Sequence, residues 1–337
     1  MSATTGDMTR SVAEARRRWL RMHGWTIGVW VLLAVLLAWY ATLIPAFGSF
    51  TIASIAKNSL QTVYLAISQG VVVIVGGIDL GAGAMMVLAN SISARLMDGQ
   101  GFGMSMVISA AVLAGAALLN GFVGWIIVRS RVPDIIVTLA TLFVFSGVAL
   151  MILPSPGGGA SGGFRAMFTG SAGGVGTNYW PSLVALVIPL AAVSVWLRRS
   201  PRGLALYAVG SDVNAAYLSG VNTARARITA YAIGGAFAAL AGLAITAITA
   251  NGDPRFTNAA NGTLNSVAAV VLGGIALTGG VGSVIGAVAA GVILFTLNPI
   301  LTAMSIDPNT AQVIRGVLIV AVMMTAGLLE VRKRRTE

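Results

Sequence analysis

The sequence predicts an all-α, polytopic membrane protein, and three observations carry this prediction. Only 9% of the 337 residues are charged, whereas a soluble domain has roughly 25% charged residues. Apolar runs of about 20 residues, long enough to cross a bilayer as a helix, recur along the whole chain. Basic residues gather before the first run and after the last, which is the orientation signal of membrane proteins. The net charge of +11 therefore indicates a lipid bilayer, and no nucleic acid, as the partner of the basic groups.

The expected domain organisation is one transmembrane domain at 25–330 between two basic cytoplasmic tails, at 1–24 and 331–337. The apolar run that begins at Trp25 is too long for a typical signal-peptide core, so we expect it to remain as the first span. Because the cytoplasmic side collects Lys and Arg, both termini are expected in the cytoplasm.

An even number of spans fits the charges, since an odd number would put one basic terminus outside. Lys57 and Arg315 then fall near the outer ends of spans, where a long basic side chain can reach the lipid headgroups. Ten spans are expected, near residues 25–45, 51–69, 70–94, 104–128, 135–153, 181–197, 229–250, 264–280, 284–303 and 312–330.

Two connections between spans are long. The segment 154–180 is rich in Gly and Ser and almost uncharged, which predicts a flexible outer loop; no Gly-Lys-Ser/Thr follows its glycines, so it is not a phosphate-binding loop. The cytoplasmic loop contains GSDVNAAYLSGVN at 210–222. Asp212 is a good N-cap, helix formers follow it, and Gly220 is a stop signal. This pattern predicts a short helix on the inner face, with an ordinary surface loop as the alternative.

An aspartate inside an apolar, glycine-rich segment predicts a broken helix. In VVVIVGGIDLGAGAMM at 71–86, Asp79 is surrounded by four glycines. A carboxylate inside a bilayer costs on the order of 3 kcal/mol, and each glycine weakens a helix by up to about 1 kcal/mol. We expect the helix to break near Gly76–Gly77 and to restart after Asp79, whose carboxylate would accept backbone N–H groups. Such a break should face the bundle interior. Asp79 could be a structural cap, a contact of the transported molecule, or a proton site.

A second glycine-rich segment resembles the first. VIVGGIDLGAG at 73–83 is similar to VVLGGIALTGG at 270–280, and in the expected topology the two run in opposite directions. Oppositely oriented, glycine-interrupted segments point to a transport site between two halves of a transporter, although shared Gly, Val and Ile could also match by chance. We therefore expect broken helices at 76–83 and 273–280, and a translocation path lined by Gly76, Gly77, Asp79, Gly81, Gly273, Gly274, Gly279 and Gly280.

The chain lacks the residues that most catalytic and metal sites need. It has no cysteine, one histidine, and three glutamates that lie near the termini, so neither a metal site, a cofactor nor a Cys or His nucleophile is expected. Neither of its two lysines follows a glycine-rich turn. The protein is therefore not expected to be an enzyme, and any ATP hydrolysis that drives it would occur in another chain.

Four stretches of the chain resemble motifs of one permease family. They are GGIDLGAG at 76–83, Asn120–Gly121 with Val132–Pro133 and IIVTLAT at 135–141, YAVGSDVNAAYLSGVN at 207–222, and LNSVAAVVLGGIALTGGVGSVIGA at 264–287. In this order, over roughly residues 50–330, they resemble the permease subunits of bacterial ABC importers of the ribose, xylose and galactose class.

The resemblance implies a solute importer of the bacterial inner membrane that carries a monosaccharide or a similar polar molecule. It implies a second permease copy in a homodimer, cytoplasmic ATPase subunits, and a periplasmic solute-binding protein. It also implies that the short helix in 210–222 couples the permease to the ATPase, through Asp212, Asn214, Ala215, Ala216 and Gly220.

The sequence departs from the family pattern at a few positions. Asp212 stands where the family usually has Asn, Asp134 where a small or apolar residue is usual, and Ser146 where an arginine is common. The solute and the ATPase partner therefore stay open. Two other classes also stay open: an ion- or proton-coupled secondary transporter, which would need several intramembrane acids where only Asp79 is a good candidate, and a passive channel.

Overall fold

The computed structural model describes residues 5–324, apart from 46, 175, 308, 315, 318–319 and 322–323, and it describes side chains from residue 24 onward. The expected tail at 331–337 and the expected placement of Arg315 lie outside the described residues, as do the side chains of residues 1–23. The expected division into one domain and two tails therefore stays a prediction.

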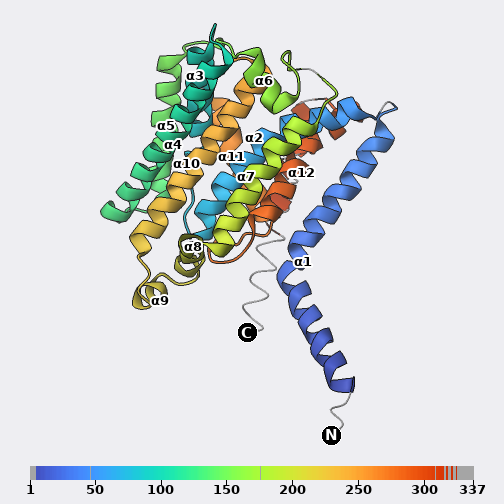
Figure 1. The fold of residues 1–337 in the computed structure, drawn as a ribbon, viewed down its shortest axis with the longest axis vertical. Helices are drawn as coiled ribbons and strands as arrows, with labels where there is room; N and C mark the ends of the chain where they lie inside the picture. The colour runs from blue at the N-terminus through green and yellow to red at the C-terminus, as the bar shows by residue number, and fades with distance from the viewer. Residues whose placement is uncertain are drawn as a thin grey trace.

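The described part is all-helical, as expected, with one isolated bridge between Gly157 and Gly252. The long helices lie side by side in one bundle, with α6 at one end and the short helices α8 and α9 at the other (Figure 1). We call these the α6 end and the α9 end. The named helices are α1 (Thr5–Leu43), α2 (Ser49–Ile74), α3 (Ala82–Met97), α4 (Phe102–Ser130), α5 (Asp134–Ile152), α6 (Gly162–Thr169), α7 (Trp180–Arg199), α8 (Pro201–Ser211), α9 (Val213–Leu218), α10 (Thr223–Thr249), α11 (Phe256–Leu272) and α12 (Val284–Ala303).

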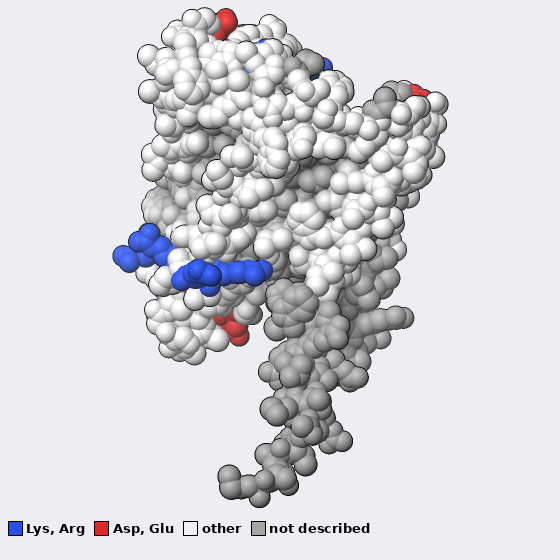
Figure 2. All heavy atoms as spheres, turned by 45° about the vertical axis from the view of Figure 1, so that its right-hand side comes forward, with Lys and Arg blue, Asp and Glu red and all other residues white. Residues whose placement is uncertain are grey.

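The chain is a multi-pass membrane protein. Among the described residues, six helical segments are long and apolar enough to span a bilayer: Gly24–Leu43 of α1, and helices α4, α5, α7, α10 and α12. The middle of the face in Figure 2 carries almost no charged side chain, and the basic groups on that face gather toward one end. The helix α2 is long but more polar, and α3 is apolar but shorter. The count of ten spans stays a prediction.

The core is built around α2, which packs against α7, α10, α11 and α12. From Val63 to Ile74 every residue of α2 is buried. The outer helices instead expose large apolar side chains, for example Leu118 of α4 at 75% and Met151 of α5 at 84%. A soluble monomer rarely exposes so much apolar surface, so these faces are suited to lipid or to another subunit.

Small residues let the inner helices approach closely. A Cβ added at Gly235 of α10 would lie 2.5 Å from the carbonyl oxygen of Ala116 and from Cβ of Asn120, both in α4. At Gly242, also in α10, it would lie 2.8 Å from the amide nitrogen of Asn90 in α3. Larger residues at either glycine would push these helices apart.

The first predicted break is present, but the predicted boundary between the second and third spans is wrong. Instead of ending at residue 69, α2 continues to Ile74. It ends because Gly76 adopts φ +85°, and because the N–H groups of Gly76 and Gly77 donate to the carbonyls of Val73 and Val72. This hydrogen-bond pair is the Schellman motif that commonly closes helices at glycine. The chain becomes helical again at Ala82.

The second predicted break is also present, and the predicted span at 264–280 is displaced. Its helix, α11, begins at Phe256 and ends at Leu272, and residues 273–283 are not helical. Gly274 has φ +83°. The N–H groups of Gly274 and Ile275 donate to the carbonyls of Val271 and Val270, which repeats the Schellman motif of the first break.

The predicted opposite orientation of the two glycine-rich segments is wrong. Leu65 of α2 lies against Gly262 of α11, and Gly70 lies against Val270. Further along, the carbonyl of Ile74 accepts a hydrogen bond from the N–H of Gly280. Residue numbers therefore rise together along both helices, so the helices that lead into the two breaks run parallel. The error follows from the misplaced boundary, which had put the first segment in the third span.

The predicted flexible loop at 154–180 contains structure, so that prediction is wrong for its middle. It includes α6, from which the Arg165 guanidinium donates hydrogen bonds to the carbonyls of Ala247 and Ile248 at the end of α10. A cation there satisfies free carbonyls and opposes the negative end of the helix dipole. Lys57 does not reach toward headgroups as expected. It is 7% exposed, and its Nζ donates to the carbonyl of Gly174 at 2.7 Å.

Candidate functional site

The first break is held together by the Asp79 carboxylate. Asp79 is only 1% exposed. Its Oδ1 accepts the N–H of Gly81 at 2.8 Å, and its Oδ2 accepts the Asn120 amide of α4 at 3.1 Å. Gly81 is the residue before α3. The carboxylate therefore bonds the start of the new helix, where an acceptor also faces the positive end of the helix dipole. The expected bond from a backbone N–H to the carboxylate is present, and Gly81 rather than Asp79 is the N-cap residue of α3. A solute contact and a proton site at Asp79 both stay predictions.

The backbone of Asp79 is bonded from α2. In the amide orientation that satisfies both groups, Gln69 donates to the carbonyl of Asp79 at 2.9 Å and accepts its N–H at 3.2 Å. On the other side, Thr263 of α11 donates to the carbonyl of Leu80 at 3.0 Å and accepts the N–H of Gly83 at 3.1 Å. Irregular backbone inside a membrane protein needs such internal partners.

Helices α5 and α10 hold the break from a third side. Thr138 of α5 donates to the carbonyl of Ile78 at 3.1 Å, and Tyr231 of α10 lies 3.5 Å from the same oxygen. The Tyr231 hydroxyl also donates to Asp134 Oδ2 at 3.0 Å. Arg227 lies 3.9 Å from Asp134 Oδ1. Because the Tyr231 hydroxyl has a single proton, the Asp134 carboxylate and the Ile78 carbonyl compete for it, and Asp134 holds the Tyr231 side chain beside the break.

The second break packs against α1 and α12. Trp25 Nε1 donates to the carbonyl of Leu272 at 2.9 Å, which satisfies a free carbonyl at the end of α11. The Trp25 ring covers Gly274, where any side chain would collide with the indole. Gly273 lies so close to the backbone of Gly286 and Ala287 in α12 that a side chain there would collide as well. Two of the predicted path glycines therefore serve close packing.

The two breaks meet each other. The Gly280 N–H donates to the Ile74 carbonyl at 2.9 Å, and a Cβ on Gly279 would lie 2.9 Å from the Cα of Gly76. Around this contact Gly76, Leu277 and Thr278 are exposed. Leu277 and Thr278 belong to the same glycine-rich segment, but the sequence interpretation selected only its glycines.

The short helix expected at 210–222 is present as α9. Asp212 Oδ1 accepts the N–H groups of Asn214 and Ala215 at 2.8 and 2.9 Å, so the predicted N-cap is confirmed. Gly220, at φ +81°, ends the helix by donating to the carbonyl of Tyr217. Only 5% of Ala216 is exposed, so this residue packs inward.

Two exposed apolar residues of α9 were missed by the sequence interpretation. Tyr217 is 70% exposed and Leu218 is 85% exposed at the α9 end of the bundle. The sequence feature that could have identified them is a pair of adjacent apolar residues in a loop that was expected to face water. Gly210, just before the α8–α9 junction, was also missed, and its role appears only from its contacts.

The predicted site residues therefore form two neighbouring groups. The first combines the two breaks, with Asp79 and Gly81 toward α4 and α5, and Gly273 and Gly274 toward α1 and α12. The second is α9 with its cap and its stop. Among the residues that the structure describes, no three His, Cys, Asp or Glu side chains lie close enough to hold a metal ion.

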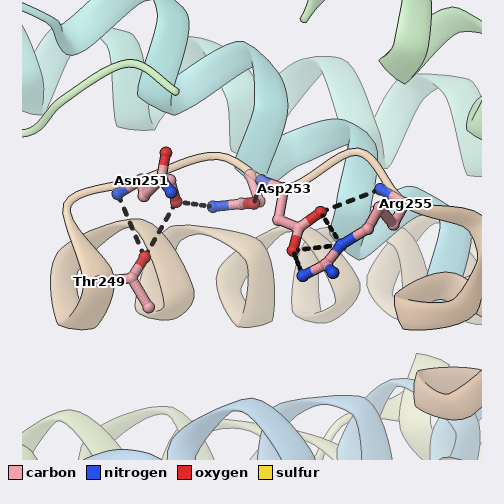
Figure 3. A network of polar contacts seen from close by, with 5 residues as sticks. Thr249, Asn251, Asp253 and Arg255 are labelled. Carbon is pink, nitrogen blue, oxygen red and sulfur yellow. Dashed lines mark hydrogen bonds and ion pairs between the residues drawn. The ribbon is translucent and has the colours of Figure 1, made fainter. Parts of the chain in front are cut away.

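The loop between α10 and α11 is fixed by a polar network (Figure 3). Asn90 of α3 donates to the Asn251 carbonyl at 3.0 Å and accepts the Asp253 N–H at 2.9 Å. Arg255 Nε donates to both carboxylate oxygens of Asp253, at 2.8 and 2.9 Å. These bonds hold the pKa of Asp253 below its usual value. The network orders the connection that leads into α11 and the second break.

Comparison with known proteins gives one family and several relatives. Residues 51–323 match the family described as branched-chain amino acid transport system / permease component. The chain is 28% identical to the ribose import permease protein of Escherichia coli over 94% of this chain and 98% of that protein. It is 31% identical to the fructose import permease protein of Rhizobium meliloti over 81% and 77% of the two chains. The corresponding values for the xylose transport system permease protein of Escherichia coli are 27%, 81% and 84%. No solved structure matches the chain.

Proposed function

We infer that this chain, which belongs to the family of branched-chain amino acid transport system permease components, is the membrane-spanning subunit of an ATP-driven importer of monosaccharides. The observation that carries this inference is the near full-length similarity to permeases named for ribose, fructose and xylose. These names favour a sugar over the amino acids in the description of the family. A hydroxyl-rich solute also suits a path that offers backbone N–H and C=O groups.

ATP hydrolysis belongs to a partner in this proposal. The chain has no glycine-rich turn followed by a lysine. The partner ATPase docks on α9, where exposed Tyr217 and Leu218 offer an apolar contact beside the capped helix. This arrangement puts the α9 end, and both termini, in the cytoplasm. A solute-binding protein then delivers the sugar at the α6 end.

A second copy of the chain completes the passage. The apolar faces of α4 and α5 are exposed in the single chain, and a homodimer would place two pairs of broken helices on either side of one path. The path residues are Gly76, Gly77, Asp79, Gly81, Gly273, Gly274, Gly279 and Gly280. Of these only Gly76 is exposed, so Gly76, together with the exposed Leu277 and Thr278 of the second break, is best placed to meet a solute.

The mechanism is alternating access driven from the α9 end. Closure of the ATPases displaces α9, and the rigid helices above it transmit the displacement to the broken segments. The solute has to be carried rather than held, because the binding protein supplies the selectivity. Coupling residues Asp212, Asn214, Ala215, Ala216 and Gly220 keep α9 folded and oriented for this step.

Reconstituted uptake tests this function. The chain, its ATPase and its binding protein are placed in liposomes, and uptake of labelled ribose, xylose, fructose and leucine is measured with and without ATP. Uptake of a sugar that requires ATP is the expected result. Uptake of leucine alone would overturn the substrate class. Uptake driven by an ion gradient without ATP would indicate a secondary transporter, and flux with neither energy source would indicate a channel.

A further inference from the structure

A third glycine joins the contact between the two breaks. Gly210 is the penultimate residue of α8, and a Cβ there would collide with the Ile74 carbonyl at the end of α2. The same Cβ would lie 2.5 Å from the Gly280 amide nitrogen. The Ile74 carbonyl and the Gly280 N–H are the two partners of the hydrogen bond between the breaks. The backbone of α8 therefore lies directly against the bond that joins the breaks.

Further contacts fix α8 to the second break. The Tyr207 hydroxyl of α8 donates to the Gly282 carbonyl at 3.1 Å. A Cβ on Gly280 would lie 2.6 Å from the Cα of Ser211, and a Cβ on Gly279 would lie 2.9 Å from the Gly210 carbonyl oxygen. We call Gly76, Gly210, Gly279 and Gly280, with the Ile74 carbonyl, the glycine junction. Backbone packed on backbone leaves no flexible side chain to absorb a displacement.

The glycine junction is also close to α9 along the chain. Only Asp212 separates α8 from α9, and Asp212 is bonded to both helices: its N–H donates to the Ala208 carbonyl, and its carboxylate caps α9. A displacement of α9 therefore passes into α8 without crossing a loop.

We propose that the glycine junction makes α8, α9 and the two broken segments move as one rigid body, with Gly210 as the positioning residue that transmits the motion of the ATPase to both breaks. This inference rests on the proposed function and adds to it the route by which ATP hydrolysis reaches the path. It requires that contact at Gly210 matters for coupling and that no relative motion occurs between α8 and the second break.

The first experiment measures coupling in Gly210→Ala. Alanine is compatible with the helical backbone at this position. Its effect should therefore come from the added methyl group, which would separate α8 from the Ile74 carbonyl and the Gly280 amide. In the reconstituted importer, sugar uptake per ATP hydrolysed should fall roughly tenfold, while binding of the ATPase and ATP hydrolysis persist. The matched control is Gly28→Ala in α1, where a Cβ meets nothing within 4 Å; it should leave uptake unchanged. Normal coupling in Gly210→Ala would overturn the proposal.

The second experiment asks whether the parts move together, and it stands even if Gly210→Ala fails to assemble. The chain has no cysteine, so Ser211→Cys and Val281→Cys can be joined by a short, reducible thiol cross-linker. Val281 is exposed and follows Gly280, which touches Ser211. A rigid body predicts that the cross-linked importer keeps its uptake rate. Loss of uptake on cross-linking, restored by reduction, would show relative motion and would overturn the proposal.

These outcomes are separate from failure of the proposed function. If the unmodified importer shows no ATP-dependent sugar uptake, the function itself is wrong. If the unmodified importer works but Gly210→Ala stays coupled, or the cross-link stops transport, only the rigid-body inference is wrong.

Discussion

At the scale of single residues, Asp79 illustrates how a membrane protein accommodates a buried carboxylate. Its two oxygens accept bonds from Gly81 and Asn120, and its backbone is bonded by Gln69. The charge is thereby matched by fixed dipoles rather than by a counter-ion. The sequence predicted this role because the needed features, an acid and adjacent glycines before a new helix, are local.

Replacement of Asp79 should separate a structural role from a solute contact. Asp79→Ala leaves the Gly81 N–H and the Asn120 amide without an acceptor, so the free energy of unfolding should fall by about 1–3 kcal/mol. Asp79→Asn keeps one acceptor and should lose less. Thermal unfolding in detergent gives the stability, and uptake kinetics give the solute affinity. A stable variant with a strongly raised KM would contradict the purely structural role.

The ion pair of Asp253 with Arg255 should contribute little, and its contribution should depend on pH. A carboxyl whose pKa is lowered in the folded state stabilises the fold above its unfolded pKa, and loses this effect as the pH falls through the folded value. Asp253→Asn should therefore cost less than about 1 kcal/mol at neutral pH, and progressively less as the pH falls below the ordinary pKa of an aspartate. Unfolding at several pH values provides the measurement. Arg255→Gln should lower the free energy of unfolding by the same amount as Asp253→Asn. The double variant should be no less stable than either single variant.

At the scale of elements, a helix was predictable where local residues determine its ends. Boundaries and directions that depend on contacts between two segments were not predictable. The short helix α9 was indicated by Asp212 and Gly220, with a surface loop as the alternative, and the family resemblance favoured the helix. The boundary between the second and third spans was not predictable, because the apolar run before Gly76 does not show which span it continues; the structure assigns it to α2, which ends at Ile74. The parallel course of α2 and α11 depends on contacts such as Leu65 with Gly262, which no local pattern records.

Helix α9 should bind its partner through its exposed apolar residues. Leu218→Glu puts a charge into the proposed contact with the ATPase, so co-purification of the ATPase should be lost while insertion in the membrane persists. A buried unpaired charge of this kind typically costs several kcal/mol. Leu218→Met keeps an apolar side chain of similar volume and should bind normally. Retained binding of the Leu218→Glu variant would show that the docking surface lies elsewhere.

At the scale of the whole molecule, composition and charge were sufficient to predict the class of the protein, and motif order was sufficient to indicate its family. The arrangement of the bundle was not, because apolar side chains specify burial without specifying a neighbour. Gly235 of α10, for example, packs against Asn120 of α4 because both helices offer small surfaces at the same level. Such a match is a property of two helices together.

The two ends of the bundle should lie on opposite sides of the membrane. Single cysteines can be placed at Ser219, beside α9, and at Ala172, beside α6, since the chain has none of its own. A membrane-impermeant maleimide should label Ala172→Cys in cells with an intact inner membrane, and should label Ser219→Cys only after permeabilisation. Labelling of both positions from one side would contradict the single crossing predicted between them, at residues 181–197.

The bond between Trp25 and Leu272 has a consequence for biosynthesis. The indole belongs to α1, whereas its acceptor follows 247 residues later in the chain. Until Leu272 has been synthesised and inserted, the indole N–H of Trp25 therefore has no carbonyl of α11 to bond. A product terminated before Leu272 would keep α1 but leave the Trp25 indole N–H without this acceptor.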